Sequence, residues 1–468
     1  MFGFRVNFNP SVQFIKKGWE EIDSSPRLIL YGFFLSLIHT VTFYHWHENS
    51  WSKTVAAGAE PICQPFFQSC GKFMILSHAQ LDLVLGFYLF YSLFTAALFL
   101  LIFLSKVDLL QIPAQTHSRS FVARVSSLAS SLASSLVLSR RFSTHHAMSH
   151  LFLLSLLKFS MFSMSFLLMG NYHYMPLIIT ILYIFWPAKR MVIPPMICSF
   201  YFAAGFLKLN HEWLSGNAVA PTTVDFLPHG LFLALCAFVV GMEIILVWGL
   251  LSRERIIRTS TLIVLLGFHI FSWQIVGYFY PVVMFMLLSW FILPELCDAL
   301  SPRRVCDAAI SGAGANVRRN HMPTLNKNNW LLFGPMVVFF LLQLVPLGFK
   351  GDSALTGEGR SFALNMFDAR AQCRSLVVAH YKNNTSKELT HSFQDLGARV
   401  KCDPYMYFNM AKNLCNKLRA DPQFADLDLY FQNKRTTDPE FKMRVSQKAF
   451  CEADHHYSVL SANSWILK

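Results

Sequence analysis

Long apolar runs follow one another along this chain and are separated by short polar connections. We place nine of them near residues 27–46, 80–105, 149–169, 174–187, 191–207, 229–251, 259–279, 280–294 and 328–347. An α-helix needs about 20 such residues to cross a hydrocarbon core of about 30 Å. The fourth and eighth runs are short and flanked by proline, so half-spans or tightly bent helix pairs are alternatives there. The pattern predicts an all-α membrane bundle of about nine segments within residues 27–347.

The composition agrees with a membrane protein. Of the 468 residues, 54% are hydrophobic and 14% are charged, whereas about 25% of the residues of a soluble domain are charged. The net charge of +13 could suggest a nucleic-acid partner. The basic residues, however, lie between the apolar runs rather than in one patch, so membrane topology explains them better. We expect membrane lipid, and no nucleic acid, as a partner.

Basic residues also predict the orientation, because they gather in alternate connections, which the positive-inside rule assigns to the cytoplasm. These residues are Lys16, Lys17, Lys106, Arg119, Arg124, Arg140, Arg141, Lys189, Arg190, Arg253, Arg255, Arg258, Arg303, Arg304, Arg318 and Arg319. Residues 1–26 are then cytoplasmic, and an odd number of crossings places residues 348–468 on the lumenal or extracytoplasmic side. The membrane would be the endoplasmic reticulum in a eukaryote and the plasma or inner membrane in a bacterium.

Two of the predicted cytoplasmic stretches differ from the short connections. Residues 107–148 are rich in serine, alanine and arginine, which is typical of a flexible loop or of an amphipathic segment at the interface. Residues 5–22 could form an interfacial helix on the inner leaflet. A solvated linker is the alternative for both, and the sequence leaves the choice open.

The cysteines divide according to this topology. Six of them fall on the predicted outer side, where disulfides form: Cys63, Cys70, Cys373, Cys402, Cys415 and Cys451. Their pairing cannot be read from the sequence, and no CxxC or Cys/His metal spacing occurs, so we expect no metal. Residues 348–468 are long enough for a small domain. Strand-like segments at SLVVAHYK and at 441–451, with a helix from Pro404, predict an α+β fold for it.

Ionisable residues near apolar runs are candidates for a functional site, because burying them in a membrane is costly. Lys208 ends the fifth run, where a lysine most often only extends its amino group to the interface. Other polar residues are predicted in the same half of the membrane: Asn171, His173, His211, Glu212, His229, His269, Ser272 and Gln274. Such a cluster could hold a lipid-soluble ring against acid–base groups. The alternative for His269 and Gln274 is interhelical hydrogen bonding, and we expect Glu243 to pair with a neighbouring helix.

Four segments carry a family resemblance. YFAAGFLKLNHEWLSG (201–216) is similar to a YFIAG-x-x-KLDADW-x-x-G segment, and Asn171-Tyr172-His173 loosely matches an Asn-Asn-His segment. FHIFSWQIVG (268–277) corresponds to FH-x-x-NSQLF-x-IG, and TGEGRSFALNMF (356–367) to a segment like TEEGHRFSWRMM. In this order they resemble the vitamin K-dependent γ-glutamyl carboxylases and their shorter relatives, the horizontally transferred transmembrane (HTTM) domain proteins.

The resemblance implies an enzyme that oxygenates reduced vitamin K, or a related quinol, to its epoxide. The strong base formed with O2 would remove a γ-proton from a glutamate in a protein substrate, and the carbanion would take up CO2. Lys208 falls on the family's base, which must be neutral to accept a proton. His173 falls on the family's catalytic histidine and Gln274 on its amide near the quinone, and we expect Asn171, His269 and His211 at the same pocket.

A second hypothesis keeps the scaffold without the chemistry. Tyr172 interrupts the Asn-Asn-His pair, and Ser272-Trp273 replaces the Asn-Ser that precedes the glutamine. These departures favour a non-enzymatic membrane protein that binds or carries a lipid or an isoprenoid quinone. Retention of Lys208 and His173 favours the enzyme.

Overall fold

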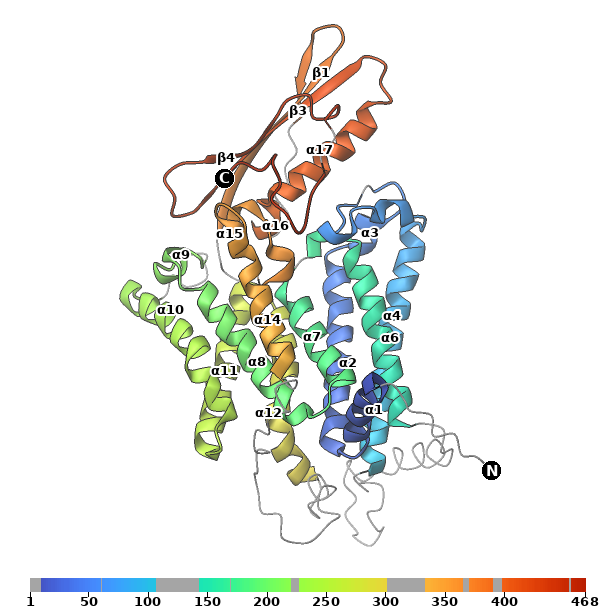
Figure 1. Cartoon of the computed structure of the whole chain (residues 1–468), viewed down its shortest axis with the longest axis vertical. Coiled ribbons are helices and arrows are strands. Elements are labelled where there is room, and N and C mark those ends of the chain that lie inside the picture. The colour runs from blue at the N-terminus through green and yellow to red at the C-terminus, as the bar shows by residue number, and fades with distance from the viewer. Residues whose placement is uncertain are drawn as a thin grey trace.

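The structure is a computed structural model, and it describes residues 10–59, 61–106, 143–168, 170–219, 227–300, 333–364, 370–389, 398–453 and 456–468. These residues form a bundle of helices with a small antiparallel sheet beyond one end (Figure 1). We call residues 370–468 the C-terminal domain, and the bundle end nearest to it the domain end. The predicted mostly helical fold with a small C-terminal α+β unit is confirmed at this level.

Each predicted apolar run overlaps a helix of the bundle. The helices are α2 (Pro26–Glu48), α4 (His78–Lys106), α6 (Thr144–Ser163), α7 (Asn171–Phe185), α8 (Lys189–Leu207), α10 (His229–Ile244), α11 (Arg255–Val276), α12 (Phe279–Leu300) and α14 (Gly334–Leu344). In the described part of the chain, five segments are long and apolar enough to cross a membrane: α2, α4, α8, α11, and α10 with the 3-10 helix that extends it to Leu251. The structure is thus consistent with a membrane protein, and nine complete crossings stay a prediction.

Small residues let the bundle helices approach closely, as they do where helices pack inside membranes. At Gly32 of α2, an added Cβ would lie 2.4 Å from the Phe99 ring and 2.6 Å from the Tyr183 hydroxyl. The Tyr183 hydroxyl in turn donates a hydrogen bond to the carbonyl of Leu28, at 2.9 Å. Helices α2, α4 and α7 therefore meet at this glycine.

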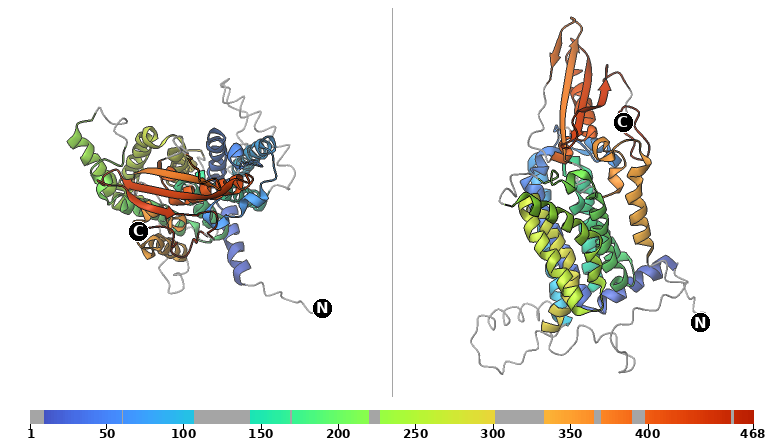
Figure 2. Two further views of the ribbon diagram at one scale, coloured as in Figure 1. Left: turned by 90° about the horizontal axis from the view of Figure 1, so that it is seen from above. Right: turned by 90° about the vertical axis from the view of Figure 1, so that its left-hand side faces the viewer.

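A helix also forms near the N-terminus, where the sequence was compatible with either an interfacial helix or a solvated linker. Helix α1 (Pro10–Asp23) packs on the bundle end opposite the C-terminal domain (Figure 2). The Trp19 indole donates to the carbonyl of Ile184 at 2.9 Å, and Lys189 Nζ donates to the carbonyl of Gly18 at 2.8 Å. The helical alternative is therefore correct for residues 10–22, and residues 5–9 lie outside the described part.

The predicted loop at 107–148 extends too far. Residues 107–142 lie outside the described part of the chain, but α6 already begins at Thr144. Its first residue is buried, and the Thr144 hydroxyl donates to an Asp23 carboxylate oxygen at 2.5 Å. This anchoring to α1 starts the helix before the apolar run begins.

The C-terminal domain is one sheet with a helix on one face (Figure 1). Strands β1 (Ala371–Tyr381), β2 (Ser386–Glu388), β3 (Phe424–Arg435) and β4 (Lys442–Gln447) are antiparallel, in the order β2-β1-β3-β4. Helix α17 (Pro404–Leu418) covers the face that carries Leu427, Leu429 and Phe431, and the Tyr407 ring stacks 4.2 Å from that of Phe431. The helix from Pro404 and the strands at β1 and β4 are confirmed, whereas β3 was not predicted.

The six cysteines of the predicted outer side form three disulfides, as expected: Cys63–Cys70, Cys373–Cys402 and Cys415–Cys451. The first lies in the connection between α2 and α4, and the other two lie in the C-terminal domain. The connection contacts this domain, because the Tyr405 hydroxyl donates to the carbonyl of Cys63 at 3.0 Å. All three disulfides therefore lie at the domain end of the molecule.

Candidate functional site

A buried ion pair joins the ends of α8 and α10. Lys208 Nζ lies 2.5 Å from a carboxylate oxygen of Glu243, and the two side chains are 0% and 1% exposed. The helices come this close because residue 205 is glycine: an added Cβ would lie 2.7 Å from Ile244 Cγ1 and 3.0 Å from Glu243 Cβ. The Trp213 ring covers the lysine, with 5.3 Å from Nζ to its centroid. Glu243 thus pairs with a neighbouring helix, as predicted, and its partner is the lysine of the candidate site.

A second hydrogen-bonded pair lies on the same side of α8. Tyr201 precedes Lys208 by seven residues, two helical turns, so both project from one face. Its hydroxyl lies 2.6 Å from His269 Nε2 on α11, and both side chains are buried. The other ring nitrogen of His269, Nδ1, is buried and has no hydrogen-bond partner among the described residues.

A narrow apolar gap runs beside Tyr201. It is lined by Asn171, Met175, Phe200, Tyr201, Ala204, Tyr280, Met284 and Leu364. Its empty volume is ≈ 210 Å³, and as it stands it is too narrow to hold a water molecule. Two of its walls are methionine side chains, which change rotamer easily and adapt to what they pack against. The lining of the gap is therefore almost wholly apolar, although Asn171, Tyr201 and Tyr280 are among its residues.

His173 is buried too, but with a different set of residues. Its Nε2 accepts a hydrogen bond from the Trp46 indole at 3.3 Å, and its ring lies 5.8 Å from that of Phe279. Its Nδ1 has no hydrogen-bond partner among the described residues. Asn171 and His173 are two residues apart on α7, which turns the chain by about 200°. They therefore face opposite sides of this helix, Asn171 toward the gap and His173 toward α2.

The remaining predicted site residues divide into exposed and structural ones. The side chains of His211, His229 and Gln274 are exposed, so the structure does not bring them into the buried group. For Gln274 the reason is helical geometry, because five residues beyond His269 the chain has turned about 140° away. Ser272 is buried and its hydroxyl bonds to the carbonyl of His269.

Glu212, four residues after Lys208, ties the bundle to the C-terminal domain. Its carboxylate accepts hydrogen bonds from the backbone N–H of Arg370 at 2.9 Å and from the N–H and hydroxyl of Thr436 at 2.8 and 2.6 Å. Arg435 Nη1 lies 3.4 Å away. Glu212 is buried by these contacts rather than by a cofactor pocket.

Sequence reasoning missed two tyrosines of the buried group, Tyr201 and Tyr280. Tyr280 is 8% exposed, lines the gap and contacts the ring of His269 at 5.6 Å. A signal for Tyr201 was present, since a tyrosine seven residues before Lys208 must share its helix face. Nothing comparable marks Tyr280, which follows a turn between two helices.

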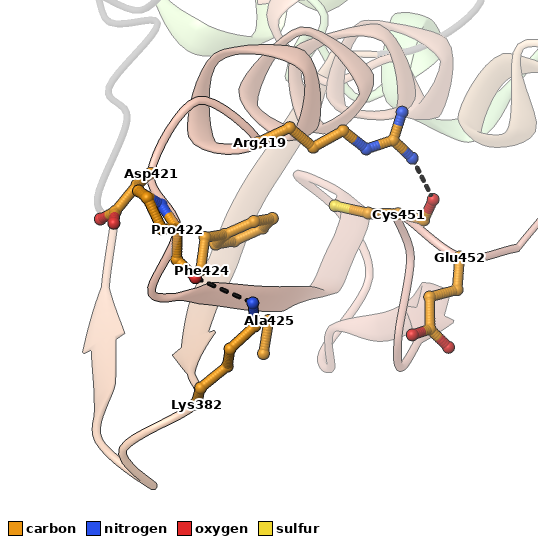
Figure 3. Close-up of a pocket in the computed structure, with 8 residues that line it drawn as sticks. All are labelled: Lys382, Arg419, Asp421, Pro422, Phe424, Ala425, Cys451 and Glu452. Carbon is orange, nitrogen blue, oxygen red and sulfur yellow. Dashed lines mark hydrogen bonds between the residues drawn. The ribbon is translucent and has the colours of Figure 1, made fainter.

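A larger cavity lies in the C-terminal domain and has a different character (Figure 3). Water can enter ≈ 470 Å³ of it, and it is lined by Lys382, Arg419, Asp421, Pro422, Phe424, Ala425, Cys451 and Glu452. Lys382 donates to the carbonyl of Pro422 at 2.8 Å, and Arg419 to that of Cys451 at 2.7 Å. Its two basic side chains thus bond to backbone carbonyls, and the carboxylates of Asp421 and Glu452 balance their charge. The cavity therefore has no net charge that would favour an anionic or a cationic ligand.

Neither metal geometry nor relatives assign the site. Within the described residues, no group of three His, Cys, Asp or Glu side chains could hold a metal ion. Comparison with protein-family models, curated proteins and solved structures gives no match to the chain.

Proposed function

We propose that the chain is an integral membrane enzyme of the γ-glutamyl carboxylase type. It would oxygenate a reduced isoprenoid quinone, such as vitamin K, and couple this to carboxylation of a glutamate in a protein substrate. One observation carries the proposal: a fully buried lysine, Lys208, lies 2.5 Å from Glu243 and two helical turns along α8 from Tyr201, which lines the apolar gap. The resemblance of four segments to the carboxylases supports the same assignment.

The residues that line the gap are of the kinds that bind a quinone, apolar side chains for its ring and polar ones for its oxygens. Its walls are apolar, and Asn171, Tyr201 and Tyr280 among the lining residues carry polar groups of the kind that ring oxygens bind once they turn toward the gap. The Nδ1 of His269, which has no hydrogen-bond partner in the described part of the chain, offers a further polar group close to Tyr201. The gap must widen to admit a ring, and rotamer changes of Met175 and Met284 would do this without moving a helix.

When bound there, a reduced quinone would supply, with O2, the strong base that removes a γ-proton from glutamate before CO2 adds. The chain's own part concerns the first proton. Lys208 can accept a proton only as a neutral amine, so its ammonium must first give one up. Glu243 lies 2.5 Å away and is the natural acceptor, because moving this proton turns two buried charges into two neutral groups. The neutral amine could then take the proton of a quinol hydroxyl that reaches beyond the gap, since Lys208 itself does not line it.

The membrane arrangement of this proposal has nine crossings, a cytoplasmic N-terminus and the C-terminal domain outside. Two features of the described residues support it. The disulfides lie at the domain end, and disulfides persist in oxidising compartments. The basic residues Lys189, Arg190 and Arg255 lie at the starts of α8 and α11, toward the opposite end, as the positive-inside rule requires of the cytoplasmic side.

The proposal is tested with purified protein in lipid nanodiscs. Reduced vitamin K and oxygen are added with and without bicarbonate, and epoxide is followed by chromatography. We expect epoxide from the wild type and none from Lys208→Ala. The matched control is Lys53→Ala, which removes an exposed lysine near the domain end and should leave turnover unchanged. Equal turnover in Lys208→Ala and wild type would remove Lys208 as the base.

The second candidate is a membrane protein that binds or carries a lipid or isoprenoid quinone without chemistry. The Lys208–Glu243 pair is compatible with this function as well, because a buried pair that satisfies its own charges can be purely structural. The same assay separates the two functions. Saturable binding of the quinol by a folded protein that forms no epoxide would establish the carrier and exclude the enzyme.

A further inference from the structure

The connection between α2 and α4 exposes large apolar side chains, although it lies beyond the ends of both helices. We call residues 61–77 the apolar loop. In it, Phe66 is 47% exposed, Phe73 is 60% exposed and Ile75 is 80% exposed. Exposed aromatic and aliphatic residues gathered in one short segment commonly mark a surface that another apolar phase covers.

The loop is held in a fixed position rather than hanging free. The Cys63–Cys70 disulfide closes it, and both cysteines are buried. Backbone hydrogen bonds join it to the end of α6: the N–H of Gln64 donates to the carbonyl of Ser163 at 3.1 Å, and the N–H of Phe166 donates to the carbonyl of Ile62 at 2.7 Å. The exposure of its apolar residues is therefore built into the fold.

The loop also reaches down the side of the bundle. Phe66 stacks on Phe159 of α6, with ring centroids 5.8 Å apart and planes at 8°. Phe159 precedes the last residue of α6, Ser163, by four residues, or about 6 Å along the helix axis. Phe66 thus lies beside the membrane-facing surface of α6 and not above its end.

This contact joins the loop to the lipid-facing surface of the bundle. On α6 the exposed apolar residues are Phe152, Leu153, Leu156 and Phe159, and on α4 they are Leu83, Phe87, Phe90, Leu93 and Phe94. Both sets recur at three- and four-residue spacing, so each forms a stripe on one helix face. Phe66 continues the first stripe, whereas Ile75 lies just before α4, whose first turns expose His78, Gln80 and Asp82 ahead of the second stripe.

We propose that the apolar loop inserts into the lipid surface at the domain end of the bundle. Its occupant is lipid and not another protein, because Phe66 continues the exposed stripe of α6, a surface that lipid must already cover. Phe66, Phe73 and Ile75 then meet acyl chains just below the headgroups. The exposed side chains of Ser69 and Lys72 would then lie at headgroup level, where a lysine reaches water from an apolar surface.

The opposite side of the loop holds the C-terminal domain. Gln68 Nε2 donates to the carbonyl of Tyr457 at 2.7 Å, and the Tyr405 hydroxyl donates to the carbonyl of Cys63 at 3.0 Å. The apolar loop would thus contact lipid on one side and the C-terminal domain on the other. Its insertion would fix how far the domain stands from the membrane surface.

Hydroxyl-radical footprinting of the wild-type protein in nanodiscs tests the proposal. The oxidation rate of each residue is compared with its rate in the unfolded chain. We expect Phe66, Phe73 and Ile75 to be as protected as Phe87, a lipid-facing residue of α4, while Leu376 on the open face of the sheet is oxidised readily. Oxidation of the three loop residues as fast as Leu376, which is less exposed than any of them, would overturn the proposal.

A photocrosslinker then identifies what covers the loop. Benzoylphenylalanine replaces Phe73, an exposed position where it should not disturb folding, and Leu376 in a control variant. Mass spectrometry should find lipid adducts at position 73 and none at 376. Adducts of position 73 with a protein chain in place of lipid would show an interface and refute lipid insertion. This outcome is independent of whether the protein oxygenates a quinol.

Discussion

The Lys208–Glu243 pair makes the sharpest stability prediction. Both side chains are almost fully buried, so removing one partner leaves the other charge buried without the carboxylate or ammonium that it faces at 2.5 Å. Breaking a buried pair in this way costs about 3–5 kcal/mol, whereas replacing both members with apolar residues is often neutral. We therefore expect Lys208→Met and Glu243→Leu each to destabilise the protein by that amount, and the double variant to be more stable than either single variant.

The assay is a double-mutant cycle on unfolding in mixed micelles titrated with SDS. Lys106, paired with Asp23 at 2.8 Å, supplies the matched control. Its side chain and that of Asp23 are 33% and 50% exposed, so Lys106→Met should cost no more than about 1 kcal/mol. Additive losses in the Lys208–Glu243 double variant would refute the reasoning, because additivity means that the two groups do not interact.

Three further predictions concern neighbouring features. Gly205→Val should separate α8 from α10 and lower thermal stability, because its Cβ would meet Ile244 at 2.7 Å; an unchanged melting temperature would contradict this packing. Glu212→Ala removes acceptors of three hydrogen bonds to the C-terminal domain, so amide exchange at Thr436 should quicken while α8 stays protected; unchanged exchange would count against the link. Burial tends to raise the pKa of Asp23, but hydrogen bonds from Lys106 and Thr144 outweigh it and lower the pKa below 3.8. The contribution of the ionised Asp23 to stability is then fully present above pH 3.8 and is lost as pH falls through the lowered pKa. Asp23→Asn should therefore be less stable than wild type at pH 7 and equally stable in strong acid. A stability difference that persists in strong acid would contradict this prediction.

The helices of the bundle were predictable because membrane helices are encoded by long apolar runs. Each predicted run coincides with a described helix, including the proline-flanked ones at α7 and α12. Strand β3 was less predictable, because its sequence, FADLDLYFQNKR, places polar residues on the open face of a sheet. A strand that is half exposed carries a weaker signal than a run that is apolar throughout.

The site was only partly predictable, because sequence order does not fix which way a side chain points. Lys208 and His269 enter the buried group and Asn171 lines the gap beside it, but His173 turns toward Trp46 on α2. Gln274 faces outward despite its place in a family-like segment. The topology predicts which polar residues share one half of the membrane. Which of them share one pocket depends on how each helix is rotated about its axis, and the apolar runs alone do not specify that rotation.

The most direct test of the quinol-oxygenating function uses labelled oxygen. Wild-type protein in nanodiscs is given reduced vitamin K under 18O2, and the epoxide is analysed by mass spectrometry. The account predicts an epoxide that carries one 18O atom, with none formed by Lys208→Ala. A folded wild-type protein that binds the quinol but returns it without labelled oxygen would contradict the account.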